Sequence, residues 1–257
     1  MDRPREPLPT RVEDTPDLPP AYHLALDAGL SALGLTLAPD VREAIDGQAR
    51  LLLAWTAAIN LTAIRDPASV ALAHVTDSLA AVPTLRELGV DRFIDLGSGG
   101  GYPGLPIAAA LPAARALLLE PIRKKAAFLS TVVEATGLAA TVEAAAVRAE
   151  ALAADRQHRG RWPAVTARAI ASLAELIELA LPLLEPGGVL VAWKRGDLEI
   201  EWSAAERAMT ALGGTALETR AVPVPGLRGH CLVLATAGPS APAIYPRDPG
   251  LRRRRAW

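Results

Sequence analysis

The hydrophobic pattern of the chain changes character near residue 90. Before that point, over residues 21–88, apolar positions recur at helical spacing. Asp40, with Glu43 three residues later, predicts a capped helix start, and Asp66-Pro67 predicts a second one. From Phe93 onward, short apolar runs alternate with longer amphipathic stretches, which predicts alternating strands and helices.

Seven apolar runs predict strands. They cover residues 93–96, 116–120, 141–146, 164–168, 189–194, 217–222 and 231–235. Helices are expected at 122–136, after a capping box at Ser172, and at 198–212. Repeated strand–helix units predict a parallel sheet, while the last two strands, with no long helix between them, predict an edge hairpin. The expected fold is therefore α/β, a mostly parallel seven-stranded sheet with helices on both faces and an N-terminal helical extension.

The same pattern divides the chain into four parts. Residues 1–20 are rich in proline and charge, which predicts a flexible tail. Residues 21–90 form the helical region and residues 91–237 the strand–helix domain. Residues 238–257 form a basic C-terminal tail that contains four consecutive arginines, Arg252–Arg255.

Composition narrows the class of protein. Of the 257 residues, 51% are hydrophobic, which is enough for a buried core. The net charge is −1, so any nucleic-acid partner must meet a local basic patch. Cys231 is the single cysteine and the four histidines are scattered, which predicts neither a disulfide framework nor a metal site. No apolar run reaches the ~18 residues of a membrane span, and no apolar signal core is present, so we expect a cytoplasmic protein with no membrane partner.

A glycine-rich loop follows the first predicted strand. It reads Asp95-Leu-Gly97-Ser-Gly99-Gly-Gly101-Tyr102-Pro-Gly104. Glycines at this place let the backbone approach a ligand closely. The spacing Gly-x-Gly-x-x-Gly from Gly99 fits a dinucleotide fingerprint. The spacing acid-x-Gly-x-Gly-x-Gly from Asp95 fits the loop with which class I, Rossmann-like methyltransferases bind S-adenosylmethionine (AdoMet).

Residues around this loop favour the second interpretation. Asp95 ends its strand, and Pro103 fits poorly inside a phosphate-binding helix start, so both favour AdoMet. Glu120 ends the second strand, where a carboxylate can accept hydrogen bonds from both ribose hydroxyls. Nicotinamide cofactors are bound in the same way, so Glu120 does not discriminate. After the third strand, Ala149 and Glu150 either read the adenine edge with backbone groups or begin a solvated helix.

Strings along most of the chain carry a resemblance to a known family. They are NLTAIRDP (60–67), HVTDSL (74–79), FIDLGSGGGYPGLP (93–106), EPIRKKAAFL (120–129), ARAIASL (167–173), WKRG (193–196), RGHCLVL (228–234) and YPRDPG (245–250). In these strings the chain resembles the 16S ribosomal RNA guanine-N7 methyltransferases known as RsmG or GidB. The resemblance implies AdoMet as cofactor and methyl transfer to N7 of a guanine in 16S rRNA of the small ribosomal subunit.

The resemblance also implies site residues. Gly97, Tyr102, Glu120, Ala149, Glu150 and Arg168 match positions of the AdoMet site. With the rest of the loop, the expected cofactor-binding residues are Asp95, Gly97, Gly99, Gly101, Tyr102, Glu120, Ala149, Glu150 and Arg168. For Arg168, a salt bridge to Asp95 or Glu120 is the alternative. Pro121 and a long loop at 154–161 depart from the family pattern.

Guanine N7 carries an exposed lone pair, so it needs no general base to act as a nucleophile. We therefore expect catalysis by positioning and no acid–base pair, and the catalytic residues stay unassigned. His74, Asp77 and Ser78 fall on one face of one helix, which either shapes the pocket beneath the glycine loop or holds a buried histidine.

A group of basic residues is either a predicted binding site for RNA or a solvated face of the protein. The candidates are Arg123, Lys124, Lys125, Lys194 and Arg228, with Arg195 and Arg252–Arg255 as extensions. Trp193 is the one candidate base-stacking residue among tryptophans expected in the core. We expect a monomer. The alternatives are a methyltransferase for another RNA or a small molecule, an NAD-dependent oxidoreductase, and a non-catalytic RNA-binding protein.

Overall fold

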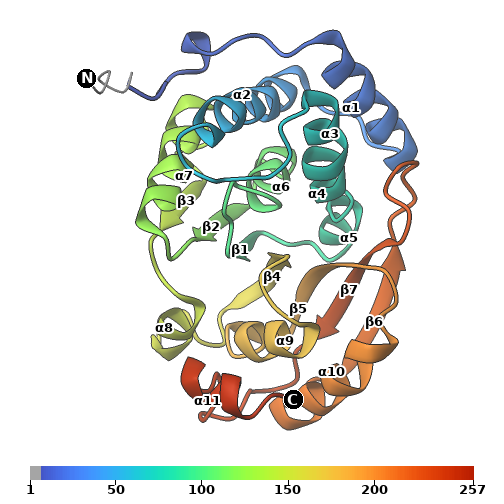
Figure 1. Cartoon of the computed structure of the whole chain (residues 1–257). Coiled ribbons are helices and arrows are strands. Elements are labelled where there is room, and N and C mark those ends of the chain that lie inside the picture. Colours follow the sequence, from blue (N-terminus) through green and yellow to red (C-terminus); the bar gives the residue numbers. More distant parts are fainter. Residues whose placement is uncertain (1–6) are drawn as a thin grey trace.

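The computed structural model describes residues 7–257. Within them, seven strands form one sheet in the order β3-β2-β1-β4-β5-β7-β6 (Figure 1). The strands are β1 Arg92–Leu96, β2 Arg115–Leu119, β3 Val142–Ala145, β4 Trp162–Arg168, β5 Leu184–Arg195, β6 Ala216–Ala221 and β7 His230–Thr236. The first five run parallel, and β7 is antiparallel to both β5 and β6. The predicted fold class is confirmed, including the antiparallel pair at one edge.

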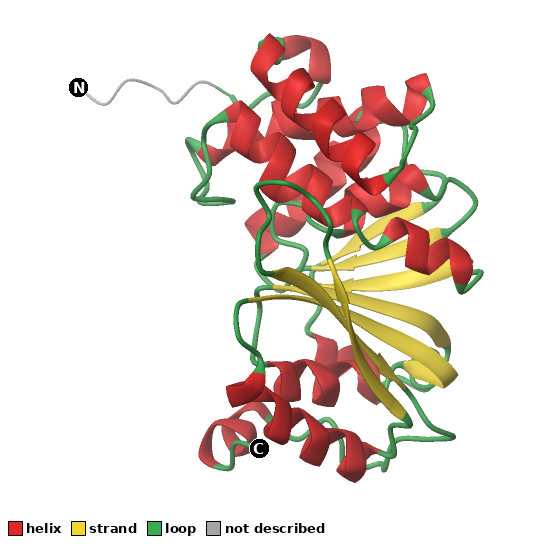
Figure 2. Cartoon of the chain, turned by 90° about the vertical axis from the view of Figure 1, so that its right-hand side faces the viewer, coloured by secondary structure: helices red, strands yellow, loops and turns green. Residues whose placement is uncertain are grey.

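Helices cover both faces of this sheet (Figure 2). On one face lie α1 Pro20–Leu33, α2 Pro39–Thr56, α3 Pro67–Val70, α4 Asp77–Leu79, α5 Val82–Glu87, α6 Gly104–Ala110 and α7 Arg123–Ala135. The other face carries α8 Ala149–Ala154, α9 Leu173–Ala180, α10 Glu199–Leu212 and α11 Pro249–Arg254. A 3-10 turn lies at Val12–Asp14, and a π-helical segment at Ala71–Thr76 joins α3 to α4.

Strand side chains alternate between two apolar cores, as the pleat of a sheet requires. Phe93 points into the core beneath α1–α7, whereas Ile94 and Leu96 point into the core beneath α8–α10. The first core also contains Tyr22 and Leu26 of α1. The N-terminal helices therefore supply the cover for one face of the sheet.

Two predicted helix caps are confirmed and one is wrong. The Asp66 carboxylate accepts the Ser69 N–H at 2.8 Å, and the Ser172 hydroxyl accepts the Glu175 N–H at 3.4 Å. Asp40 does not cap α2, which begins at Pro39 instead. Proline suits the first helical position because its φ angle is already helical and its missing N–H would find no partner there.

The described part of the predicted N-terminal tail packs against α2. Trp55 Nε1 donates a hydrogen bond to the Pro9 carbonyl at 2.7 Å, and Arg50 Nε donates to Thr15 Oγ1 at 3.1 Å. Thr15 is buried. Residues 7–19 thus contact α2 through Pro9 and Thr15, and the first six residues of the predicted tail lie outside the described part of the chain.

Among the described residues, the stretch Pro67–Glu87 alone is long and apolar enough to cross a membrane by length and composition. It comprises α3 to α5, and 61% of its most apolar window is buried inside the fold. The core helices of soluble proteins have the same properties.

Candidate cofactor pocket

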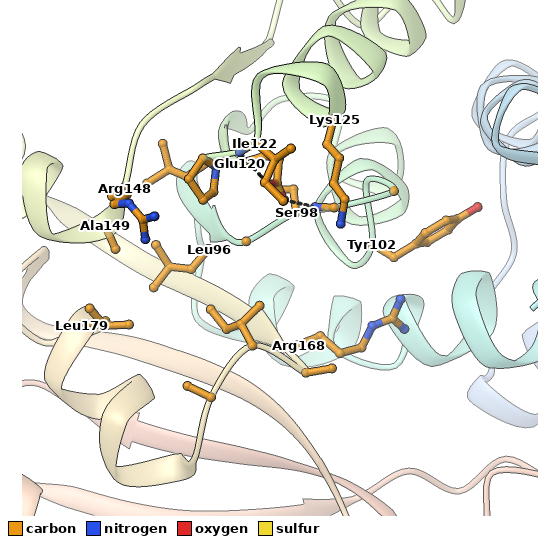
Figure 3. Close-up of a pocket in the computed structure, with 18 of the residues that line it drawn as sticks. Leu96, Ser98, Tyr102, Glu120, Ile122, Lys125, Arg148, Ala149, Arg168 and Leu179 are labelled. Carbon is orange, nitrogen blue, oxygen red and sulfur yellow. Dashed lines mark hydrogen bonds between the residues drawn. The ribbon is translucent and has the colours of Figure 1, made fainter. Parts of the chain in front are cut away.

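A cavity of about 560 Å³ opens at the carboxyl ends of β1, β2 and β4. Its volume is typical of sites for small molecules and cofactors, and such sites lie at this edge of α/β sheets. The predicted residues that line it are Gly97, Gly99, Tyr102, Glu120, Lys125, Ala149, Glu150 and Arg168. Figure 3 shows Lys125 extending from α7 into the same space as Tyr102 and Arg168, with Arg148 and Ala149 at the opposite end.

Of the remaining predicted residues, Arg252 also lines the cavity, and the others lie elsewhere. Asp95, behind the loop, and Gly101, within it, do not line the cavity. Arg123, Lys124 and Arg228 are exposed outside it. Lys194 is largely buried, and its ammonium group lies 2.6 Å from the Glu201 carboxylate.

Glycines are required in this loop because of its backbone conformation and its close contacts. Gly97 has φ +67°, a left-handed conformation that side chains rarely adopt. A Cβ atom on Gly97 would lie 2.5 Å from Ile170 Cγ2, and one on Gly104 would lie 2.7 Å from the Asp95 carboxylate. The loop is thus wrapped tightly around Asp95 on one side and around the cavity on the other.

Asp95 supports the loop from behind. Its Oδ1 accepts a hydrogen bond from the Thr166 hydroxyl at 2.7 Å, and its Oδ2 accepts the Gly104 N–H at 3.2 Å. Because it is fully buried, desolvation raises the pKa of the carboxyl to about 6, against the opposing effect of these hydrogen bonds. Asp95 therefore joins β1, β4 and α6, while its neighbours in the loop face the ligand space.

Glu120 joins the two loops that enclose the cavity. Its Oε2 accepts the Gly99 N–H at 3.0 Å, and its Oε1 accepts the Ile122 N–H at 2.9 Å. A carboxylate has about four acceptor sites, so two remain for donors on a ligand. The side chain is thereby fixed in position before any ligand arrives.

Arg168 pairs with a carboxylate that sequence reasoning did not choose. Its Nη1 lies 3.0 Å from Asp77 Oδ2, whereas Asp95 and Glu120 are bonded elsewhere. Asp77 also lies 3.0 Å from His230 Nδ1 through its other oxygen. The His-x-x-Asp-Ser spacing was the available signal for Asp77, but it identifies a polar helix face and not the partners of that face.

His74 provides a flat, uncharged wall. Its ring stacks on Tyr102 with centroids 4.9 Å apart, and its Nε2 lies 2.7 Å from Thr62 Oγ1. Burial, together with the charge of Arg168, lowers the pKa of His74 to about 4, so the imidazole is neutral at pH 7. Of this helix face, His74 lines the cavity, whereas Asp77 and Ser78 are buried and do not. Trp193 is buried and donates to the Asp77 carbonyl at 2.7 Å, so it is not a base-stacking residue.

Comparison with known proteins decides the family. Residues 42–225 match the family described as "rRNA small subunit methyltransferase G", or GidB. A relative from Dehalococcoides mccartyi (strain CBDB1), named "Ribosomal RNA small subunit methyltransferase G", is 38% identical over 224 residues, which are 87% of this chain and 94% of the relative. The chain belongs to this family. A relative of the same name from Deinococcus radiodurans is 39% identical and covers 91% of this chain and 92% of its own length.

Solved structures agree on the fold. The O-methyltransferase from Bacillus cereus in complex with SAH superimposes with a TM-score of 0.53 at 18% identity, covering 75% of this chain and 91% of that chain. TYW2 of P. horikoshii in complex with MeSAdo gives a TM-score of 0.51 at 16% identity, covering 65% and 64%. As a family member with this fold, the protein is an AdoMet-dependent methyltransferase. The prediction of AdoMet as cofactor is confirmed, and an NAD-dependent oxidoreductase is not favoured.

Proposed function

We propose that the protein transfers the methyl group of AdoMet to N7 of a guanine in 16S rRNA of the small ribosomal subunit. The observation that carries the proposal is that residues within the family match line the cavity at the carboxyl ends of the strands. That cavity gathers Gly97, Gly99, Tyr102, Glu120, Ala149, Glu150 and Arg168. The protein is expected to act in the cytoplasm, as a monomer.

The cavity fits AdoMet in size and in its donors and acceptors. The bends at Gly97 and Gly99 leave room for the methionine moiety, because a side chain there would enter the ligand space. The two free acceptor sites of Glu120 suit the ribose hydroxyls. Ala149 and Glu150, at the far end, are placed to contact the adenine. When bound, AdoMet supplies a methyl group on a positively charged sulfonium.

The reaction requires position more than proton transfer. The N7 lone pair of guanine attacks the methyl carbon, the carbon–sulfur bond breaks, and the positive charge passes from sulfur to the methylated purine. No proton moves, so a neutral His74 is consistent with the chemistry. Holding the two reactants in line accounts for about 7–11 kcal/mol in such reactions.

RNA would reach the cavity from the side of α7. Arg123 and Lys124 are exposed at the start of this helix, next to Lys125, which enters the cavity. Cations at a helix N-terminus are unfavourable by themselves, and a bound phosphate would offset that cost. The target base must leave its stack to enter, and the stacked His74–Tyr102 wall offers a flat surface at the mouth.

The test is to incubate the protein with methyl-labelled AdoMet and small ribosomal subunits that lack the modification, and then to map the labelled base. We expect label on one guanine, at N7, in 16S rRNA. Gly97→Val, whose Cβ would lie 2.5 Å from Ile170 Cγ2 in the cavity wall, is the inactive control. A wild-type protein that labels a small molecule or another RNA, and leaves 16S rRNA unlabelled, would contradict the proposal.

A further inference from the structure

The C-terminal segment, residues 238–257, lies beyond the family match, which ends at residue 225. It nevertheless contributes Arg252 to the lining of the cavity. It runs along α9 to reach α8 (Figure 1). Its anchor is Glu178 of α9, a carboxylate with no solvent exposure. Arg247 donates three hydrogen bonds to Glu178, from Nε at 2.9 Å, Nη2 at 2.6 Å and the backbone N–H at 2.8 Å, and Trp257 Nε1 adds a fourth at 2.7 Å.

This anchor places α11 against the rim of the cavity. Arg252, in the middle of α11, lines the cavity together with Glu150 and Glu175 and is only 9% exposed. Its Nη2 is ion-paired with Glu150 Oε1, and its Nε lies 3.3 Å from Glu175 Oε1. A third group, Nη1, donates to the Arg247 carbonyl at 3.3 Å. The sequence prediction that Arg252 joins a basic RNA-binding patch is therefore wrong, because its guanidinium is already engaged.

Glu150 pairs with this arginine. Among the described residues, Arg252 is the one side chain that forms an ion pair with Glu150. Glu150 lies in the first turn of α8. This helix has six residues, of which Leu152 and Ala153 are buried. Without Arg252, two carboxylates would face each other at the cavity rim without a cation between them.

We propose that Arg252 is a positioning residue for AdoMet, which acts by holding Glu150 and by closing the cavity at its purine end. The inference rests on the proposed placement of the adenine at Ala149 and Glu150. Arg252 acts through its ion pair with Glu150 and takes no part in methyl transfer, so its loss should lower cofactor affinity and leave the chemical step unchanged.

The first experiment compares Arg252→Gln with Arg253→Gln. Both remove one positive charge from the same helix, but Arg253 is exposed. Calorimetric titration should show that Arg252→Gln binds AdoMet about tenfold more weakly, within the range of couplings between contacting charged residues, whereas Arg253→Gln binds as the wild type does. In turnover, KM for AdoMet should rise by the same factor while kcat at saturation stays unchanged.

Three further measurements separate positioning from general electrostatics and from loss of structure. S-adenosylhomocysteine lacks the sulfonium charge, so a positioning effect predicts the same loss for both ligands, while a field effect predicts different losses. In a Glu150→Gln background, Arg252→Gln should have little additional effect, because the arginine acts through that carboxylate. Arg252→Lys keeps the charge but cannot bridge two carboxylates, and it should show a smaller loss.

Equal affinity for AdoMet in Arg252→Gln and in the wild type would overturn the inference, and so would additive losses in the double variant. If Arg252→Gln does not fold, as judged by thermal unfolding, Arg252→Lys decides: wild-type affinity overturns the inference, and a loss shared by both ligands supports it. The proposed function fails in another way, through a wild-type protein that binds AdoMet and leaves 16S rRNA unmethylated.

Discussion

The buried carboxyl of Asp95 should make the stability of the protein depend on pH. Burial raises the pKa of Asp95 from 3.8 to about 6. Asp95→Asn keeps the size of the side chain and an oxygen for the Gly104 N–H, and its amide can still bond the Thr166 hydroxyl. The substitution therefore removes the titration and retains most of the packing.

The direction in which the free energy of unfolding changes with pH follows from which state, folded or unfolded, holds the proton. Below pH 4 the carboxyl is protonated in both states and contributes no pH dependence. Between pH 4 and 6 the unfolded chain releases its proton while the folded protein holds it, so the free energy of unfolding falls as pH rises. The shift of about two pKa units corresponds to about 3 kcal/mol, lost in full above pH 6.

The assay is urea unfolding of wild type and Asp95→Asn at intervals from pH 3.5 to 7.5. The difference in unfolding free energy between the two should change by about 3 kcal/mol across this range, in favour of the variant at high pH. Asp91→Asn, whose side chain is 70% exposed, controls for the loss of one carboxylate. Parallel curves for wild type and Asp95→Asn would refute the reasoning.

Three other predictions concern the loop, the cofactor and RNA. Gly104→Ala should lower the free energy of unfolding by about 1–3 kcal/mol, measured in urea, because the new Cβ would lie 2.5 Å from a buried side chain. Glu120→Gln should weaken AdoMet binding about tenfold in calorimetry, since an amide oxygen cannot replace both carboxylate oxygens; unchanged affinity would contradict its role. Replacing Arg123 and Lys124 by alanine should reduce the salt dependence of RNA binding by about one unit of slope per residue, whereas replacing the exposed Arg207 of α10 by alanine should not.

The features that could be predicted from the sequence are those set by residues close together in the chain. The strands of the sheet, the caps at Asp66 and Ser172, and the glycine loop follow from spacing and turn chemistry, which are properties of neighbouring residues. The cofactor pocket could be predicted because its parts come from strand ends, which meet at one edge of a parallel sheet.

What the sequence could not predict depends on partners far apart in the chain. Arg168 finds Asp77 across 91 positions, and the choice among several carboxylates is made by packing. Arg252–Arg255 looks like one solvated charge run, yet the fold buries Arg252 and leaves the next three exposed. Residues 7–19 lack a hydrophobic pattern, but Trp55 and Arg50 of α2 donate hydrogen bonds to Pro9 and Thr15.

The carboxylate of Asp77 has a bearing on how this enzyme can be cut down or recombined. Asp77 lies on α4, in the helical layer, and its carboxylate contacts Arg168 of β4 and His230 of β7. Its backbone carbonyl accepts a hydrogen bond from the indole N–H of Trp193 in β5. A fragment starting at residue 91 would leave these three side chains without their shared partner and expose an apolar sheet face to water. Anyone seeking a minimal catalytic unit, or grafting this half onto another protein, must carry the helices along.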